Sequence, residues 1–383
     1  MTRLDATPGT RPGVTTAEVA RALHPLDEDL PAGVHHELAA FLATKRADAE
    51  AVDPAFAAAA DSLIDFVLGG GKRIRPTFAW WGWRGAGGSP EDPEAAAVLR
   101  VVSSLELIQG SALVHDDLMD GSTTRRGTPT VHVDFAGRHR DAGWLGAPER
   151  FGAAAAILLG DMALAWADDM LRGAGLRPDV LRRALAVWQA MRTELFGGQY
   201  LDVLTQARGD DSPEAALRVD RYKTAAYTVE RPLHLGAAIA GAEPALVAAY
   251  RRFGVDVGVA FQLRDDLLGM FGDPAVTGKP AGDDLREGKR TLLLACGLRA
   301  AADRGARHAA DVLRTAIGDP DLRPGTVDAV RGLLVELGAV RQVECRITEL
   351  TESALDVLEG ADVAAPAADR LAELAVLTTC RTC

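Results

Sequence analysis

Hydrophobic residues recur at spacings of three and four along almost the whole chain from Val34 onward, which is the period of an α-helix with one buried face. Runs in which β-branched and polar residues alternate are hardly present. The pattern therefore predicts an all-α fold of roughly ten to thirteen helices. Clear examples of the spacing are Leu38-Phe41-Leu42, Leu181-Leu185-Trp188 and Leu333-Leu334-Leu337. Breaks that contain glycine and proline fall at residues 69–71, 87–90, 121–129, 137–148, 209–213, 272–282 and 319–324.

The first part of the chain differs from the rest. Residues 1–33 carry scattered proline, glycine and threonine, and we expect them to form a flexible leader with one short helix. Residues 34–383 show neither a clear shift in composition nor a repeat of solenoid period. They are predicted to form one large helical domain.

The overall charge narrows the choice of partners. The 383 residues include 42 Lys and Arg against 54 Asp and Glu, a formal net charge of −12. Non-specific nucleic-acid binding needs a basic field, so no nucleic-acid partner is expected. Any anionic substrate must be held by local cations or metal ions, against the field of the whole protein.

Four cysteines are too few for a disulfide framework in a chain of this length, which indicates reduced thiols and a cytoplasmic protein. The longest uninterrupted apolar run, near residues 151–160, has about ten residues and is too short to span a bilayer. We therefore expect no transmembrane segment. The terminal Cys380-Arg-Thr-Cys383 lacks the aliphatic residues of a prenylation signal, and the role of its cysteines stays open.

An acidic group stands inside an otherwise apolar helical segment at Asp116, Asp117 and Asp120. Residues four apart lie on the same helix face one turn apart, so Asp116 and Asp120 converge. Carboxylates this close repel one another unless a cation lies between them, and hard oxygen ligands suit Mg²⁺. A solvated acidic turn at a helix end is the alternative interpretation.

A second acidic group makes that alternative less attractive. Gln262, Asp265 and Asp266 again lie within an apolar helix, about 150 residues further along. Two such groups are what a metal site built from two facing helices requires.

Basic residues beside glycine or hydroxyl groups complete the picture. Each of them alone is typical of surface charge, but together with two acidic groups they indicate phosphates held by Mg²⁺, lysine and arginine. They are Lys72 and Arg75 in a glycine-rich helix start, Arg125 and Arg126, Lys223 with Thr224, Lys279, and Lys289.

Six motifs occur along residues 70–290 in a characteristic order. They are Gly-Gly-Lys-Arg-Ile-Arg-Pro, Asp-Asp-Leu-Met-Asp followed by Arg-Arg-Gly, Gly-Gly-Gln-Tyr-Leu-Asp, Tyr-Lys-Thr, Phe-Gln-Leu-Arg-Asp-Asp, and Gly-Lys-Pro followed by Glu-Gly-Lys. In these motifs the chain resembles the trans-isoprenyl diphosphate synthases (polyprenyl synthetases), in particular the bacterial geranylgeranyl and farnesyl type. The helical pattern extends the resemblance to residues 34–378.

The resemblance implies a single helical bundle around a central apolar cavity. It also implies condensation of isopentenyl diphosphate with an allylic diphosphate (dimethylallyl, geranyl or farnesyl) to give a trans-polyprenyl diphosphate. The implied cofactor is Mg²⁺, roughly three ions, with Mn²⁺ as an alternative. Similar enzymes are commonly homodimers, so a homodimer is expected.

Residue roles also follow from the resemblance. Asp116, Asp120 and Asp265 correspond to Mg²⁺ ligands, with Asp117 and Asp266 supporting them. The resemblance implies that the allylic diphosphate is held by Arg125, Lys223, Thr224, Gln262 and Lys279. The isopentenyl diphosphate site corresponds to Lys72, Arg75, Gln109 and Arg126, and Gln109 stands where such enzymes often have His. Asp284 and Lys289 lie in the segment that closes over the loaded site. The expected catalytic set is Asp116, Asp117, Asp120, Arg125, Lys223, Asp265 and Lys279.

The second acidic motif departs from the family, because Gly269 stands where a third aspartate is usual. We expect Asp273, four residues further on, to substitute in part. The number of bound ions is the property that this departure affects.

Product length is expected to depend on the residues one turn before Asp116. Ser111 and Ala112 are small and leave room for a growing tail, whereas an aromatic side chain would block it. Ile108, with Leu107 and Leu105, is expected to form the floor. A C20 product is favoured, with farnesyl or longer diphosphates as alternatives.

Two other functions compete with prenyl transfer. A class I terpene cyclase would share the helical fold and acidic motifs but would leave Lys72, Arg75 and Arg126 unexplained. A non-catalytic subunit of a two-chain synthase would be expected to have lost acidic residues, and both motifs keep an Asp-Asp pair. The tryptophans at 80, 81 and 83 are expected in the core.

Overall fold

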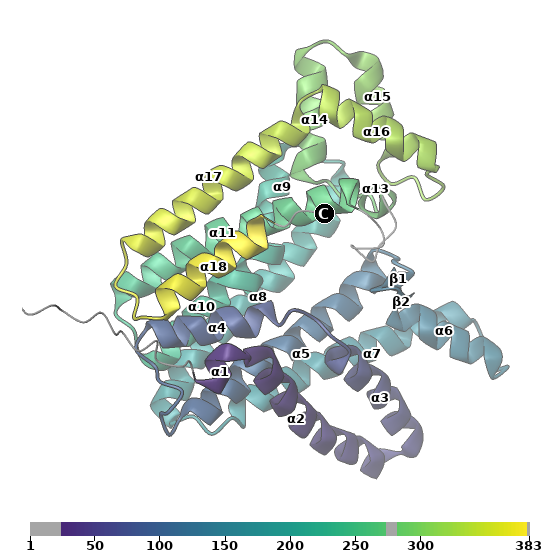
Figure 1. Ribbon diagram of the computed structural model, residues 1–383. Helices are drawn as coiled ribbons and strands as arrows, with labels where there is room; N and C mark the ends of the chain where they lie inside the picture. Colours follow the sequence, from purple (N-terminus) through teal and green to yellow (C-terminus); the bar gives the residue numbers. More distant parts are fainter. Residues whose placement is uncertain (1–23, 273–281, 381–383) are drawn as a thin grey trace, which may run out of the picture.

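The computed structural model describes residues 24–272 and 282–380, and it confirms the all-α class. Its elements are α1 (Pro25–Glu28), α2 (Leu30–Val52), α3 (Pro54–Leu68), α4 (Ile74–Gly85), α5 (Ala95–Met119), β1 (Thr124–Arg125), β2 (Thr128–Pro129), α6 (Val131–Asp141), α7 (Pro148–Arg172), α8 (Pro178–Arg208), α9 (Pro213–Val219), the π-helix η1 (Asp220–Glu230), α10 (Arg231–Ala240), α11 (Pro244–Phe271), α13 (Asp283–Arg286), α14 (Leu292–Asp303), α15 (Arg307–Ala316), α16 (Pro324–Glu336), α17 (Ala339–Glu359) and α18 (Ala367–Thr379). The short helices α14, α15 and α16 gather at the end of the molecule opposite α2 and α3 (Figure 1).

The helical body begins before residue 34. Asp27 in α1 is buried, accepts a hydrogen bond from Trp80 Nε1 at 2.8 Å and pairs with Arg84 at 3.0 Å. Leu30, the first residue of α2, is also buried. Residues 24–33, which the sequence placed in a flexible leader, are therefore part of the packed structure, because one buried ion pair ties α1 to α4.

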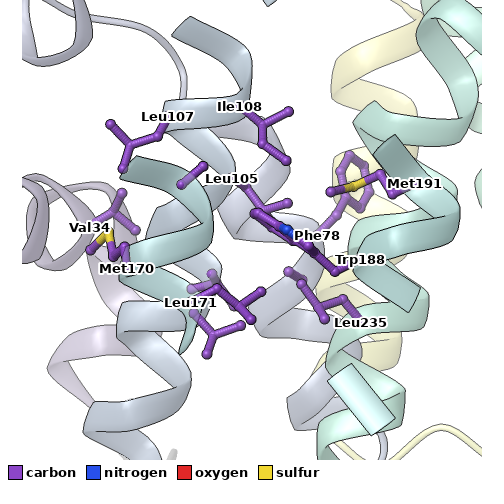
Figure 2. Packing of buried hydrophobic residues seen from close by; sticks show 14 of the residues in the cluster. Val34, Phe78, Leu105, Leu107, Ile108, Met170, Leu171, Trp188, Met191 and Leu235 are labelled. Carbon is purple, nitrogen blue, oxygen red and sulfur yellow. The ribbon is translucent and has the colours of Figure 1, made fainter. Parts of the chain in front are cut away.

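The central helix is α5, which packs against α7, α2 and α4. The expected core positions of the three tryptophans Trp80, Trp81 and Trp83 are confirmed, since all are buried. Figure 2 shows side chains of α2, α4, α7, α8 and α10 meeting those of α5. Its labelled residues are Val34, Phe78, Leu105, Leu107, Ile108, Met170, Leu171, Trp188, Met191 and Leu235.

The π-helix η1 is held between α8 and α11 at unusually short distance. A Cβ atom at Gly198 would lie closer than 3.0 Å to the backbone of Lys223. A Cβ atom at Gly258 would lie 2.5 Å from the Cα atom of Ala225. Glycine at both positions therefore lets two helices approach η1 and fixes where Lys223 and Thr224 point. π-Helical turns are rare and often mark functional sites.

Two helices, α5 and α7, are long and apolar enough to cross a membrane by length and composition alone. In α5, 78% of the apolar window is buried inside the protein, as in any core helix. In α7 the buried share is 39%. Two such helices are weak evidence for membrane insertion, and the absence of a transmembrane segment stays a prediction.

Candidate active site

A cavity of about 1100 Å³ opens between α5, α8, η1 and α11. Both acidic motifs contribute to its walls, through Asp116 of α5 and Asp265 of α11. The structure therefore brings together two groups that are 149 positions apart in the sequence (265 − 116). Other predicted site residues that line the cavity are Lys72, Arg75, Gln109, Ala112, Arg125, Arg126, Lys223, Thr224, Gln262, Asp266, Asp284 and Lys289.

Asp116 is surrounded by hydrogen-bond donors. Lys223 Nζ lies 2.9 Å from its Oδ1 atom, and the Gln199 amide donates to the same oxygen at 3.2 Å. Lys223 also binds Asp202 at 2.6 Å. Burial opposes ionisation of Asp116, but Lys223, Lys289 and Arg125 outweigh it and hold the pKa of this carboxyl below its usual range. Asp116 is therefore a permanent carboxylate.

Asp120 has a different environment, although it directly follows the helix that carries Asp116, as its C-cap residue. Its side chain is only 4% exposed, and its Oδ2 atom, 3.3 Å from Lys289 Nζ, accepts no well-oriented hydrogen bond. Burial, followed by repulsion from Asp116, raises the pKa of Asp120 to about 6. A metal ion bound beside this oxygen would supply the partner that it lacks.

Lys289, three residues after α13, contacts the first acidic motif. Its ammonium lies 3.3 Å from Asp120, 3.4 Å from Asp284 and 2.6 Å from Glu287. Burial alone would lower the pKa of Lys289, but these carboxylates hold it well above its ordinary value. The ammonium therefore stays charged.

The second acidic motif is joined to η1 by hydrogen bonds. Thr224 Oγ1 donates to Gln262 Oε1 at 2.8 Å, and Gln262 Nε2 donates to Asp266 at 2.7 Å. Burial raises the pKa of Asp266 well above its ordinary value, and the carboxylates of Asp220 and Asp284 add to the effect. Thr224 and Gln262, which the sequence assigned to one ligand, do lie together.

The donor set fits magnesium. Aspartate oxygens from two facing helices are the hard ligands that Mg²⁺ prefers, and Mg²⁺ usually also takes oxygens from water or from a substrate phosphate. Among the described residues, no three acidic, histidine or cysteine side chains converge closely enough to chelate an ion by themselves. Asp116 and Asp265, which line the cavity, would hold the ions together with a phosphate ligand, whereas Asp120 is buried beside Lys289 and is not among the lining residues.

Arg125 and Arg126 are positioned by a tight hairpin. Strands β1 and β2 are joined by Arg126 and Gly127, both with positive φ (52° and 77°), as in the type I′ turn that suits two-residue hairpins. Arg125 forms two hydrogen bonds of 2.8 Å with Asp117. Asp117 is buried and does not line the cavity; it holds Arg125, which does line it.

Arg75 and Gln109 are linked through Tyr227, which the sequence analysis missed. The Arg75 guanidinium lies 4.0 Å from the centre of the Tyr227 ring and donates to Thr228 at 2.8 Å. The Tyr227 hydroxyl donates to Gln109 Oε1 at 2.8 Å. No pattern in the sequence singled it out, because its partners lie on α4 and α5 and its own helix, η1, has the wider turn of a π-helix.

The residues expected to set product length do not all line the cavity. Ala112 lines the cavity. Ser111 and Ile108 are buried but are not among the lining residues, because Ile108 packs into the core instead (Figure 2). Lys279 and Asp273 lie outside the described residues, as does Cys383.

Two further features of the cavity wall were missed. Asp220 lines the wall, and burial together with the nearby Asp202 raises its pKa to about 8. It is a single acid in a mixed sequence, and no pattern singles it out. Glu106 forms a buried ion pair with Arg73 at 2.6 Å, so the charge of this arginine, which stands between Lys72 and Arg75 in the sequence, is neutralised within the protein.

The C-terminal helix forms part of the cavity mouth. Val376, Leu377 and Cys380 are lining residues. Arg264 of α11 holds this helix end, donating to the Thr379 carbonyl at 2.8 Å. In Figure 1, α18 runs beside α11, in agreement with the contacts between them.

The sequence matches the polyprenyl synthetase family over residues 57–328. It is 33% identical over 298 residues to the geranylfarnesyl diphosphate synthase of Aeropyrum pernix, covering 77% of this chain and 85% of that protein. A geranylgeranyl diphosphate synthase of Mycobacterium tuberculosis is 37% identical over 243 residues, which is 63% of this chain and 62% of that one. The crystal structure of geranylgeranyl pyrophosphate synthase from Corynebacterium glutamicum, complexed with isoprenyl diphosphate and magnesium, superposes with a TM-score of 0.89 at 46% identity and covers 92% of this chain and 98% of that chain.

Proposed function

This chain belongs to the polyprenyl synthetase family and is a trans-prenyltransferase, and from that premise we propose that it makes geranylgeranyl diphosphate. The proposed reaction joins isopentenyl diphosphate to an allylic diphosphate. One observation carries the assignment of the site: two acidic helices and a set of buried cations meet in one cavity. The relatives' names supply the substrate class.

We propose that the allylic diphosphate binds between Asp116 and Asp265, with Arg125, Lys223, Thr224 and Gln262 as its protein contacts. Mg²⁺ held by Asp116, Asp120 and Asp265 would draw charge from the diphosphate and make it a better leaving group; the count of about three ions, and Mn²⁺ as a substitute, follow from the resemblance alone. Lys223 contributes a fixed positive charge, because its two carboxylate partners keep it protonated. Lys279 remains an expected contact.

The second diphosphate is proposed to bind at Lys72, Arg75, Gln109 and Arg126. Arg75 Nε is buried without a hydrogen-bond partner among the described residues, so the guanidinium keeps a donor for a ligand. When the allylic C–O bond breaks, pyrophosphate leaves with the electron pair and the new C–C bond forms to the isopentenyl double bond. The proton that is then lost goes to the departing pyrophosphate. Apolar walls that include Leu113 and Phe261 keep water from the cation.

We propose a C20 product because Ala112, one turn from Asp116, is small and lines the cavity. The test is product analysis with labelled isopentenyl diphosphate, and chains that stop at C15 would refute the proposal. Ala112→Phe should shorten the product, because its ring would fill the path of the tail. Ala112→Ser is the matched control and should leave the product length unchanged.

The assay that separates the competing functions uses the purified chain alone, Mg²⁺, isopentenyl diphosphate and each allylic primer. Elongated diphosphates are expected. A cyclic hydrocarbon would favour the terpene cyclase, and no product without a second chain would favour the non-catalytic subunit. Asp116→Asn and Asp265→Asn should each reduce the rate by about 10²-fold or more.

We also propose that the protein acts in the cytoplasm as a homodimer. Exposed apolar side chains of α7 and α8 support the dimer, notably Leu158 and Tyr200, which are 68% and 67% exposed. Such surfaces are typical of subunit interfaces. Light scattering coupled to gel filtration should give twice the chain mass, and a monomer at micromolar concentration would contradict it.

A further inference from the structure

The helix that carries Lys223 and Thr224 changes its turn twice. Helix α9, the π-helix η1 and helix α10 follow one another without a break, and the wider π-helical turn extends over the 11 residues of η1. Such a length is unusual, since π-helix occurs mostly as single turns inside α-helices. Contacts with the rest of the protein must therefore hold η1 in this form.

An ion pair joins the two ends of η1. Arg221 Nη1 lies 2.6 Å from Glu230 Oε2. The two residues are nine positions apart (230 − 221), and in an α-helix that spacing makes about two and a half turns and puts the side chains on opposite faces. With the i→i+5 bonds of a π-helix the same spacing makes roughly two turns, so both side chains lie on one face. The pair is therefore compatible with the π-helical turn and not with the α-helical one.

Glu230 is fixed at its own end of η1. Its side chain is buried, and its other oxygen, Oε1, accepts a hydrogen bond from Arg251 of α11 at 2.9 Å. A Cβ atom at Gly254 of α11 would lie 2.4 Å from the Cα atom of Glu230, so the two backbones are in close contact there. This contact with α11 does not depend on the turn of η1. Arg221 is therefore the partner whose reach to Glu230 depends on that turn.

The opposite face of η1 belongs to the cavity. Lys223, Thr224 and Tyr227 line the cavity, whereas Arg221 and Glu230 lie outside its lining. A change from π-helical to α-helical turns would rotate the second half of η1 relative to the first. The three lining side chains would then no longer face the cavity together.

We propose that Arg221 and Glu230 are positioning residues whose ion pair keeps η1 π-helical, so that Lys223, Thr224 and Tyr227 face the cavity together. The inference rests on the proposed function of the cavity. Both residues act through the helix between them and not by contact with a substrate. Loss of the pair would release the wider turn and weaken the binding of both diphosphates.

The test compares the two arginines that share the Glu230 carboxylate. Arg221→Met removes the partner that depends on the turn, and Arg251→Met is the matched control, since each variant leaves Glu230 with one arginine. Relative to R251M, R221M should speed hydrogen exchange at the amides of residues 225–230 by about tenfold or more. It should also weaken the Mg²⁺-dependent binding of inorganic pyrophosphate by about tenfold or more. Arg221→Lys restores the charge and should recover most of both losses.

Exchange is measured by mass spectrometry, binding by calorimetry without turnover, and folding by thermal melting. If R221M does not fold, Arg221→Gln is compared with Arg251→Gln in the same way. Equal effects of the two arginine variants, or an R221K variant without recovery, would show that the pair only adds stability and would overturn the proposal. Failure of the proposed function would look different, because the unmodified protein would form no elongated diphosphate while the difference in exchange remained.

Discussion

Tyr227→Phe tests whether the hydroxyl of Tyr227 positions Gln109, a residue that we expect to bind isopentenyl diphosphate. The change removes only the hydroxyl that donates to Gln109 at 2.8 Å. A neutral hydrogen bond contributes about 1 kcal/mol, and 1.4 kcal/mol corresponds to tenfold, so binding should weaken about fivefold. The ring stays, and with it the contact to Arg75 at 4.0 Å.

The assay is steady-state kinetics with each substrate varied in turn. The KM for isopentenyl diphosphate should rise about fivefold, while the KM for the allylic substrate stays within about twofold. Tyr227→Leu, which also removes the ring beneath Arg75, should cost a further factor of roughly two to thirty.

Tyr250→Phe is the control, because its hydroxyl is buried and has no hydrogen-bond partner among the described residues. It should leave both KM values unchanged. The reasoning fails if Y227F raises the two KM values equally, or if Y250F produces the same kinetic change.

Three further predictions concern η1 and the metal site. Gly198→Ala should destabilise the fold by about 1–3 kcal/mol in urea unfolding and slow turnover, because the methyl group would displace Lys223. Its neighbour Gly197 has open space around it, so Gly197→Ala should stabilise α8 by about 1 kcal/mol; equal losses in both variants would contradict this view. Asp220 has a pKa of about 8 when folded and an ordinary one when unfolded, so the folded state binds the extra proton between about pH 4 and 8 and stability falls as the pH rises through that window. Asp220→Asn should therefore gain melting temperature relative to the unmodified protein as the pH rises from 5 to 8, and a constant difference would refute the assignment. Mg²⁺ together with inorganic pyrophosphate should raise the melting temperature more than either alone, EDTA should reverse the gain, and Asp116→Asn should abolish it.

Local spacing was sufficient to predict much of this site. Asp116 and Asp120 are four residues apart at the end of α5, and the Asp120 amide still bonds the Asp116 carbonyl as in any α-helix. The pairing of α5 with α11 across a cavity followed from the occurrence of two acidic motifs within apolar helices. Residues whose role depends on their own helix were therefore accessible to sequence reasoning.

Contacts between distant segments were not accessible in this way. Tyr227 acts on Gln109 and Arg75 through a π-helix, whose wider turn no apolar pattern announced. Asp284 approaches Gly269 because α13 folds back along α11. Ser111 was expected to line the cavity, yet it is buried elsewhere, because adjacent residues on a helix point about 100° apart.

The attachment of α18 has a consequence for biosynthesis. The ribosome makes this helix after α5, η1 and α11, yet Val376 and Leu377 belong to the cavity wall. Arg264 must therefore wait, during translation, for the Thr379 carbonyl that it binds in the finished protein. A chain made only as far as α11 would lack Val376 and Leu377, so this part of the cavity wall would stay incomplete until α18 had been made and had docked.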